Sequence, residues 1–243
     1  MKLSIIVPAY NEEKRIANTL EKYFDFFSKK YGNGFEVLVM MDGCTDKTPQ
    51  IVKEFSKRHR QVKYENHLGK LGKGIAIVNG FKKAKGDIVS FIDADGSTEP
   101  PDMYRIINEL ENSHYDGAIA SRYVETSSVT VKQKIMRRIV SRGFNIMVRL
   151  LFGLPYRDTQ CWAKAYRKYV VKNIINDIGI TEWVFDVNIL YAIHKKGYVI
   201  KEVPITWKNQ EGSKFKMRMT VPMMFLALIR FRLKKSPLGK YIR

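Results

Sequence analysis

The segment Ile88–Pro100, IVSFIDADGSTEP, joins an apolar half to an acidic half. Its first residues are large and hydrophobic, which is typical of a strand buried on both faces of a sheet. Two aspartates, Asp93 and Asp95, follow with one alanine between them. Neighbouring like charges disfavour each other's ionisation, so such a pair needs either a cation or a solvated turn. The segment therefore predicts a buried strand that ends in a polar loop of functional interest.

Apolar runs of the same kind alternate along the chain with segments of helical periodicity. Strands are expected at Leu3–Val7, Phe35–Met41, Val62–Tyr64, Asp87–Ile92 and Gly117–Ala120. Helices are expected at Arg15–Ser28, Thr48–Lys57, Lys73–Ala84 and Asp102–Asn112. This alternation is typical of parallel strands joined by right-handed crossovers. We therefore predict an α/β fold with a Rossmann-like, mostly parallel sheet flanked by helices.

Polar clusters follow three of the expected strands, where a parallel sheet binds its ligands. The clusters are PAYNE at 8–12, DGCTD at 42–46 and DADGS at 93–97. We expect Asp46 to cap the following helix and Asp42 to accept a hydrogen bond from a nucleobase. The glycine-rich stretch HLGKLGKG does not fit the phosphate-loop pattern, so it is expected to form a tight start to the next helix.

The aspartate pair suits a divalent cation. Mg²⁺ and Mn²⁺ prefer oxygen ligands, take few of them from the protein, and complete their shells with water and substrate phosphates. We expect Asp95 to bind the metal, with Asp93 beside it. The alternative is a solvated turn in which an aspartate precedes the helix at Asp102. The position beside two other polar strand ends favours the metal site.

The composition is globular and strongly basic. Of the 243 residues, 45% are hydrophobic, which predicts one large domain. The 43 Lys and Arg residues against 24 Asp and Glu give a net charge of +19, which indicates an anionic partner: nucleic acid, an acidic membrane surface or a phosphorylated substrate. Cys44 and Cys161 form no CxxC pair, so neither a disulfide framework nor a zinc site is expected.

Two acid-free segments carry much of this charge. No Asp or Glu occurs in residues 126–157 or 212–243. Within them, Val131–Leu151 and Met217–Lys235 combine apolar side chains with Lys and Arg in helical patterns. We expect basic amphipathic helices near 131–151 and 217–235 that lie in a membrane interface. The alternative is that their apolar faces pack on the protein core.

The expected relation to the membrane is peripheral. The longest charge-free apolar run, Met219–Ile229, is too short to span a bilayer, so we predict no transmembrane span. The chain is expected to lie as a monotopic protein on the cytoplasmic face. We divide it into a main α/β domain at 1–213 and a basic amphipathic C-terminal segment at 214–243.

The order of the motifs resembles that of the inverting family 2 glycosyltransferases. Residues 3–124 contain SIIVPAYNEE, VLVMMDGCTDKT, LGKGIAIVNGFKKAKGDIVSFIDADGS and IASRYV in this order. Further on, RDTQCWAKAYRK, EWVFDV and VPITWKNQEGSKF resemble the polyprenyl-phosphate branch, dolichyl-phosphate glucosyltransferases most and dolichyl-phosphate mannose synthases next. The resemblance implies a GT-A fold and the transfer of a hexose, glucose favoured and mannose next, from a nucleotide-diphospho-sugar to dolichyl phosphate with inversion. UDP-glucose is the favoured donor and GDP-mannose the second.

The resemblance also implies roles for individual residues. The positions that match nucleotide-sugar contacts are Pro8, Ala9, Tyr10, Glu12, Asp42, Asp93 and Ala94. Asp95 matches the ligand of Mg²⁺ or Mn²⁺, with Asp93 beside it. Arg122, Arg137 and Lys214 match phosphate-binding positions, and Asp95, Arg122 and Arg137 form the expected catalytic set.

Three positions depart from the family pattern. Met41 replaces the first acid of the usual DDGS, and Ser97 stands where a mannose synthase has a glutamine metal ligand. Trp162 falls where a small glycine is usual, which reshapes the expected sugar pocket.

A lipid-phosphate acceptor needs no protein base, because a phosphomonoester with a second pKa of about 6 carries its own nucleophilic anion. Asp158 and Asp186 could act as bases if the acceptor were a sugar hydroxyl, and we interpret them as structural or acceptor-side groups. The main alternative is therefore a family 2 transferase that acts on a hydroxyl of a polysaccharide or glycolipid.

Two remote alternatives lie outside the family. A haloacid-dehalogenase-type phosphatase would use Asp93 as its nucleophile, but the sequence offers no later acidic pair for its metal. A nucleic-acid binder would explain the charge, but it would need exposed aromatic platforms that the basic segments do not offer. We therefore expect no nucleic-acid partner.

Overall fold

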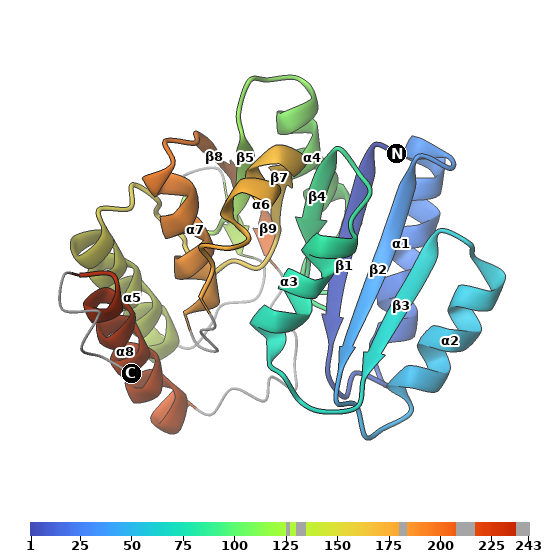
Figure 1. The fold of residues 1–243 in the computed structure, drawn as a ribbon, viewed down its shortest axis with the longest axis horizontal. Helices are drawn as coiled ribbons and strands as arrows, with labels where there is room; N and C mark the ends of the chain where they lie inside the picture. The colour runs from blue at the N-terminus through green and yellow to red at the C-terminus, as the bar shows by residue number, and fades with distance from the viewer. Residues whose placement is uncertain (125–126, 130–134, 180–183, 208–216, 237–243) are drawn as a thin grey trace.

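The computed structural model describes residues 1–124, 127–129, 135–179, 184–207 and 217–236. Its main feature is a seven-stranded sheet of order β3-β2-β1-β4-β7-β5-β8 (Figure 1). The strands are β1 (Leu3–Ala9), β2 (Phe35–Asp42), β3 (Val62–His67), β4 (Ile88–Phe91), β5 (Gly117–Ser121), β7 (Lys164–Arg167) and β8 (Ile200–Pro204). A short second sheet pairs β6 (Ser128–Val129) with β9 (Thr206–Trp207).

The sheet is parallel except at one strand. β7 runs antiparallel to both of its neighbours, β4 and β5, whereas the other pairs in the sheet are parallel. The five strands expected from the sequence are all present and begin within one residue of their predicted positions. The predicted mostly parallel α/β fold is thus confirmed.

Helices cover both faces of the sheet (Figure 1). The first face carries α1 (Ile16–Tyr31), α2 (Thr48–Arg58) and α4 (Pro100–Glu111). The second carries α3 (Lys73–Lys83), α6 (Lys168–Ile174), α7 (Phe185–Lys195), α5 (Ile135–Phe152) and α8 (Met217–Lys234). The four helices expected between the first strands are confirmed, with ends within about three residues of the prediction.

Local chemistry sets where two of these helices begin. Proline stands in the first turn of α2 and of α4, where its missing N–H costs no hydrogen bond. The Asp46 carboxylate accepts a hydrogen bond from the Thr48 N–H at 2.9 Å, at the start of α2. Asp46 thus satisfies an N–H of the first turn, as expected of a cap, although the residue at the N-cap position is Lys47.

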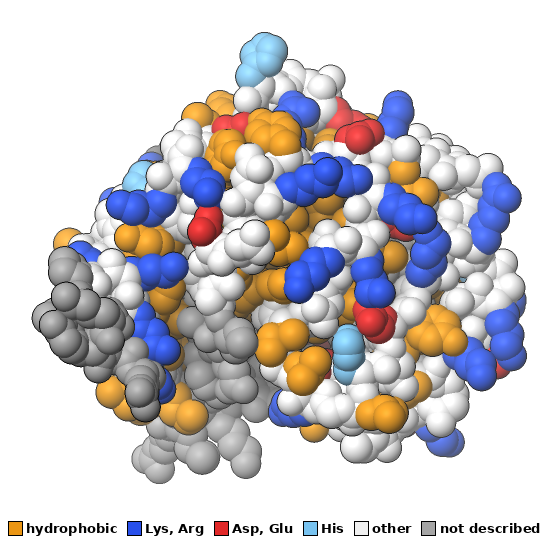
Figure 2. Space-filling view, viewed as in Figure 1, with side chains coloured by type: hydrophobic (Ala, Val, Ile, Leu, Met, Phe, Trp, Pro, Cys, Tyr) orange, Lys and Arg blue, Asp and Glu red, His pale blue; other side chains and the backbone are white. Residues whose placement is uncertain are grey.

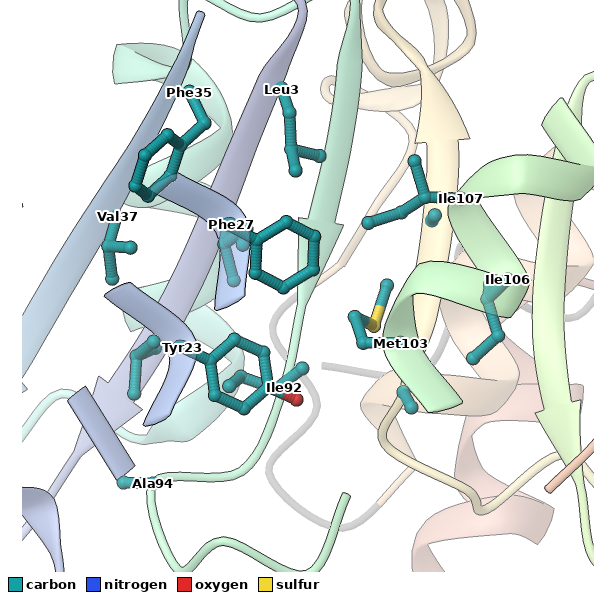
Figure 3. Packing of buried hydrophobic residues seen from close by; sticks show 14 of the residues in the cluster. Leu3, Tyr23, Phe27, Phe35, Val37, Ile92, Ala94, Met103, Ile106 and Ile107 are labelled. Atoms are coloured by element: carbon teal, nitrogen blue, oxygen red, sulfur yellow. The ribbon is translucent and has the colours of Figure 1, made fainter. Parts of the chain in front are cut away.

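Alternation along the central strands builds a core on each side of the sheet. On β1, Leu3 and Ile5 join the cluster of the first face, whereas Ile6 joins the cluster of the second. Figure 3 shows the first cluster, in which Tyr23 and Phe27 of α1 lie beside the sheet. Each large side chain buried in this way contributes about 1.5–3 kcal/mol to the stability of the fold. Because the central strands are buried on both faces, their sequences are continuous apolar runs.

The two basic helices pack against each other and against the core of the second face. Phe152 of α5 stacks on Phe231 of α8 with ring centroids 5.1 Å apart. Phe144 and Leu228 are also buried in that cluster. The helices expected near 131–151 and 217–235 are thus present, and one face of each belongs to the core. Among the described residues, no helix is both long and apolar enough to cross a bilayer.

Candidate active site

The carboxyl ends of β1, β2 and β4 meet at one edge of the sheet, beside a cavity of about 420 Å³. We call this cavity the sheet-edge pocket. Its lining residues are Pro8, Ala9, Tyr10, Glu12, Asp42, Lys70, Lys73, Ala76, Asp93, Ala94 and Asp95. The structure therefore brings together all seven residues expected at the nucleotide-sugar and the expected metal ligand. Lys70, Lys73 and Ala76 are additional members that the sequence did not identify.

Asp42 fixes one wall of the pocket. Its carboxylate is buried and accepts hydrogen bonds from the backbone N–H groups of Leu71, at 2.6 Å, and Gly72, at 2.8 Å. Gly43 has a φ of +68°, and a Cβ there would lie 2.9 Å from the backbone nitrogen of Lys70. Only glycine therefore fits where this loop crosses the end of β2. If Asp42 also bound a nucleobase, it would do so through the same carboxylate oxygens that accept hydrogen bonds from Leu71 and Gly72.

Arg15 links two acidic members of the pocket. It donates to both carboxylate oxygens of Glu12, at 2.7 and 2.8 Å, and its Nη1 lies 3.9 Å from Oδ2 of Asp95. The other oxygen of Asp95 accepts a hydrogen bond from the Ser97 N–H at 2.9 Å. A guanidinium beside the expected metal ligand adds positive charge where an anionic ligand would enter.

Lys73 is the second cation of the site. Its ammonium pairs with Asp93 and lies 3.4 Å from the centroid of the Trp162 ring. Lys70, on the loop that precedes Lys73, lies 4.3 Å from the ring centroid of Tyr10. Both lysines belong to the stretch HLGKLGKG, for which the sequence predicted only a tight start to a helix. The expected tight start of a helix is present at Lys73, and the lysines on that stretch also face the pocket.

The donor set of the pocket fits a metal with few protein ligands. Among the described residues, no group of three or more His, Cys, Asp and Glu side chains is placed to hold a metal ion. Asp93 and Asp95 alone would suit Mg²⁺ or Mn²⁺, whose remaining positions go to water and phosphate. Ser97 adds a buried hydroxyl for which the structure shows no hydrogen-bond partner, next to Asp95 in the same turn.

Arg122 lies outside the residues that line the pocket. Its guanidinium donates to both oxygens of Asp158, at 2.7 and 3.0 Å, and its backbone N–H donates to the same carboxylate. Burial acts to raise the pKa of Asp158, but the contact with Arg122 holds it below its usual value. The contact with Arg122 fits the structural role expected for Asp158. Phosphate binding by Arg122 stays a prediction.

A second buried ion pair joins Lys164 of β7 to Asp186 of α7, and both side chains are almost inaccessible to solvent.

Two further predicted phosphate contacts cannot be placed. Arg137 lies in the first turn of α5, where only the backbone is described, and Lys214 lies outside the described residues.

Comparison with known proteins decides the family. The sequence profile described as Glycosyl transferase family 2 matches residues 4–175. The chain belongs to glycosyltransferase family 2. This confirms the resemblance drawn from the order of motifs. Dolichyl-phosphate beta-glucosyltransferases are similar at 31% identity in Saccharomyces cerevisiae, covering 87% of this chain and 68% of that protein. The corresponding protein of Dictyostelium discoideum is also 31% identical, over 96% of this chain and 74% of that protein.

Solved structures share the fold of this family 2 chain. Glucosyl-3-phosphoglycerate synthase from Mycobacterium tuberculosis, in complex with Mn²⁺, UDP and phosphoglyceric acid, superposes with a TM-score of 0.69 at 16% identity over 95% of this chain and 78% of that one. TarS 1-349 from S. aureus, in complex with UDP, gives a TM-score of 0.60 at 24% identity over 98% of this chain and 67% of that one. At these identities the likeness establishes the GT-A-type fold.

Proposed function

We propose that the chain transfers a hexose from a nucleotide-diphospho-sugar to polyprenyl (dolichyl) phosphate, with UDP-glucose as the favoured donor and GDP-mannose as the second. The observation that carries the proposal is the sheet-edge pocket, where an aspartate pair and two lysines line one cavity and Arg15 lies 3.9 Å from Asp95. Similarity to dolichyl-phosphate beta-glucosyltransferases over 87–96% of the chain supports the sugar and the lipid acceptor.

The charges of the pocket suit a diphosphate bound through a metal. Asp93 and Asp95 would hold Mg²⁺ or Mn²⁺, which would neutralise the charge that develops on the leaving diphosphate. Lys70, Lys73 and Arg15 would add positive charge around the same group. UDP is bound in the structures of both neighbours described above, and one of these also contains Mn²⁺.

The state of the two possible bases favours a phosphate acceptor over a sugar hydroxyl. Asp158 is held by Arg122, and Asp186 is held by Lys164, so each carboxylate is buried against a cation. A lipid phosphate needs neither of them, because its own oxygen attacks the anomeric carbon. A new carbon–oxygen bond then forms as the bond to the nucleoside diphosphate breaks, and this single displacement inverts the anomeric centre.

The test is an acceptor assay with a panel of labelled UDP- and GDP-sugars, Mn²⁺ and polyprenyl phosphate in vesicles. We expect UDP-glucose to label the lipid fraction best, and mild acid to release that label, because a glycosyl phosphate is acid-labile. EDTA should stop the reaction. A lipid product whose label survives mild acid would mean that the acceptor is a hydroxyl, and the lipid-phosphate proposal would then be rejected.

The outer faces of α5 and α8 support a proposed attachment to an anionic membrane surface. Their exposed apolar side chains are Ile139, Ile146, Leu150, Met223, Leu226, Ile229 and Leu233. Their exposed basic side chains are Arg142, Arg149, Arg230, Arg232 and Lys234. Figure 2 shows basic and hydrophobic side chains next to each other over these helices, at the left of the view. Such a surface combines apolar insertion with attraction to acidic lipids.

Replacing Leu150 and Leu226 together with glutamate should weaken binding to anionic vesicles by about tenfold or more, because it removes apolar insertion and adds like charge to the lipid. Both side chains are well exposed, at 79% and 67%, so the fold should be kept. Vesicle sedimentation measures the effect. Removal of α8 is a poorer test, because Leu228 and Phe231 would leave the core.

The matched control is Tyr64→Glu, which changes an exposed side chain on β3, at the opposite side of the molecule from α8 (Figure 1). It should bind vesicles as the unchanged chain does. Transfer to a long-chain polyprenyl phosphate should slow in the double variant, whereas transfer to a short water-soluble prenyl phosphate should not. Equal vesicle binding by both variants at low salt would rule out this surface.

A further inference from the structure

We propose that Trp162 is a positioning residue that holds the Lys73 ammonium in the sheet-edge pocket, where this ammonium binds the diphosphate of the donor. The inference rests on the proposed use of a nucleotide-diphospho-sugar and is independent of the acceptor. It assigns a purpose to Trp162, whose ring lies against the Lys73 ammonium.

The contact between the two residues is close. The Lys73 Nζ lies 3.4 Å from the centroid of the Trp162 ring, well inside the ~6 Å range over which a tryptophan face attracts a cation. The same ammonium pairs with Asp93. A lysine side chain has several rotatable bonds, so two partners of different kinds fix its end much better than one. The ammonium has three N–H donors and can bind a further anion while it keeps the contact with Asp93.

The indole is itself held by a rigid aromatic support. It stacks on Phe185 with an interplanar angle of 16° and meets the edge of Phe91 at 72°, with centroid distances of 6.4 and 6.0 Å. Gly74 makes this support possible, because a Cβ at that position would lie 2.7 Å from the Phe185 ring. Gly74 follows Lys73 directly, so the residues that place the lysine and those that place the indole are packed as one unit.

A second ammonium lies near the same ring. Lys164 Nζ is 6.0 Å from the Trp162 centroid and pairs with the buried Asp186. Burial raises the pKa of Asp186, Lys164 and Lys73 both act to lower it, and Asp93 acts to raise it. The charges of the pocket and of the buried pair are therefore coupled through this region. The Trp162 ring lies near the ammonium groups of both Lys73 and Lys164 and attracts each of them. This attraction lets the Lys73 ammonium stay beside the pocket although a like charge is near.

This arrangement predicts which part of the donor is affected. Asp93 and Asp95 repel a diphosphate, and a cation fixed next to Asp93 offsets that repulsion where the phosphates must approach. The loss of Trp162 should weaken the binding of UDP and of UDP-glucose by the same factor. It should not change the binding of uridine, which has no phosphate.

The experiment is a double-mutant cycle measured by calorimetric titration of UDP in the presence of Mn²⁺. Trp162→Leu keeps an apolar side chain but removes the aromatic face, and we expect UDP to bind about 5- to 30-fold more weakly. Trp162→Phe should retain most of the affinity. In a Lys73→Ala background, Trp162→Leu should have no further effect. Lys82→Ala removes an exposed lysine from the same helix and should leave UDP affinity unchanged.

Additive losses in the cycle would overturn the inference, because Trp162 would then act independently of Lys73. A loss confined to UDP-glucose, with UDP unchanged, would also overturn it, since Trp162 would then contact the sugar. If Trp162→Leu fails to fold, the cycle is run with Trp162→Phe, and its smaller effect must still vanish without Lys73. Failure of the unchanged chain to bind UDP would instead reject the proposed donor, which is a different result.

Discussion

Replacing Asp95 with alanine is expected to abolish sugar transfer, with a loss on the order of a thousandfold, or about 4 kcal/mol of transition-state stabilisation. Asp95 lines the sheet-edge pocket and is the proposed ligand of the divalent metal that would bind the leaving diphosphate. Its side chain is partly exposed, at 29%, so the substitution should leave the fold intact. Transfer measured at saturating Mn²⁺ and UDP-glucose checks the effect.

Two control variants separate metal binding from loop structure. The Asp95 carboxylate also accepts the Ser97 N–H, so alanine removes a turn hydrogen bond worth about 1 kcal/mol as well as a charge. Asp95→Asn keeps an acceptor for that N–H and should still lose transfer while melting like the unchanged chain. Glu99→Ala removes a carboxylate of the same loop that pairs with Lys22, outside the pocket lining, and should retain activity. Normal transfer by Asp95→Asn would contradict the metal assignment.

Asp93→Asn should act differently from Asp95→Asn. We expect weaker donor binding with some remaining turnover, because Asp93 pairs with Lys73 and shares the metal site instead of dominating it. Titration of UDP-glucose at several Mn²⁺ concentrations measures this. If Asp93→Asn binds donor normally at every metal concentration, the two aspartates do not act as a pair.

The first half of the fold could be predicted because its local signals agree. Residues 3–120 alternate between apolar runs and helical patterns. The runs of β1, β2, β4 and β5 are buried along their whole length, whereas β3 at the edge of the sheet is largely exposed. β7 could not be predicted in the same way. It has only four residues, KAYR, and its direction depends on pairing with β4 and β5, which are far away in the sequence. A lysine in a buried strand, Lys164, is explained only by its partner Asp186 in three dimensions.

The residues of the site also divide into those that the sequence could place and those that it could not. Residues within two positions of a strand's end, such as Tyr10 and Asp93, could be placed from the sequence because parallel strands end at a common edge. Lys73 lines the pocket from the start of α3, and Arg15 approaches Asp95 from the residue that precedes α1. No sequence spacing specifies those directions, which is why the cations of the site were missed.

The basic helices show a limit of amphipathic patterns. The sequence left open whether the apolar residues of α5 face a membrane or the core, and the helix has both kinds: Ile139 and Leu150 are exposed, whereas Phe144 and Val148 are buried. An apolar helix residue can face either a protein core or a lipid surface, and the pattern alone does not distinguish them. Contact with α8 decides which face of α5 is internal.

The buried pair of Arg122 and Asp158 should give the largest change in stability. Arg122→Ala leaves a fully buried carboxylate without its cation, which typically costs about 3–5 kcal/mol. We therefore expect a marked fall in the free energy of unfolding, measured by urea denaturation at pH 7. Arg122→Met with Asp158→Leu, which removes both charges, should be clearly less destabilised than either single variant.

The pH dependence of this effect has a defined sign. The folded pKa of Asp158 is lowered, although burial opposes the shift, so the carboxylate binds its proton less readily in the folded than in the unfolded chain. The stabilisation from the pair is complete above the unfolded pKa of about 4 and is lost as the pH falls through the lower, folded pKa. The difference between Arg122→Ala and the unchanged chain should therefore narrow in acid. If Arg122→Ala instead unfolds at the same urea concentration as the unchanged chain but transfers sugar poorly to lipid phosphate, Arg122 is a phosphate ligand and its pair with Asp158 adds little to stability.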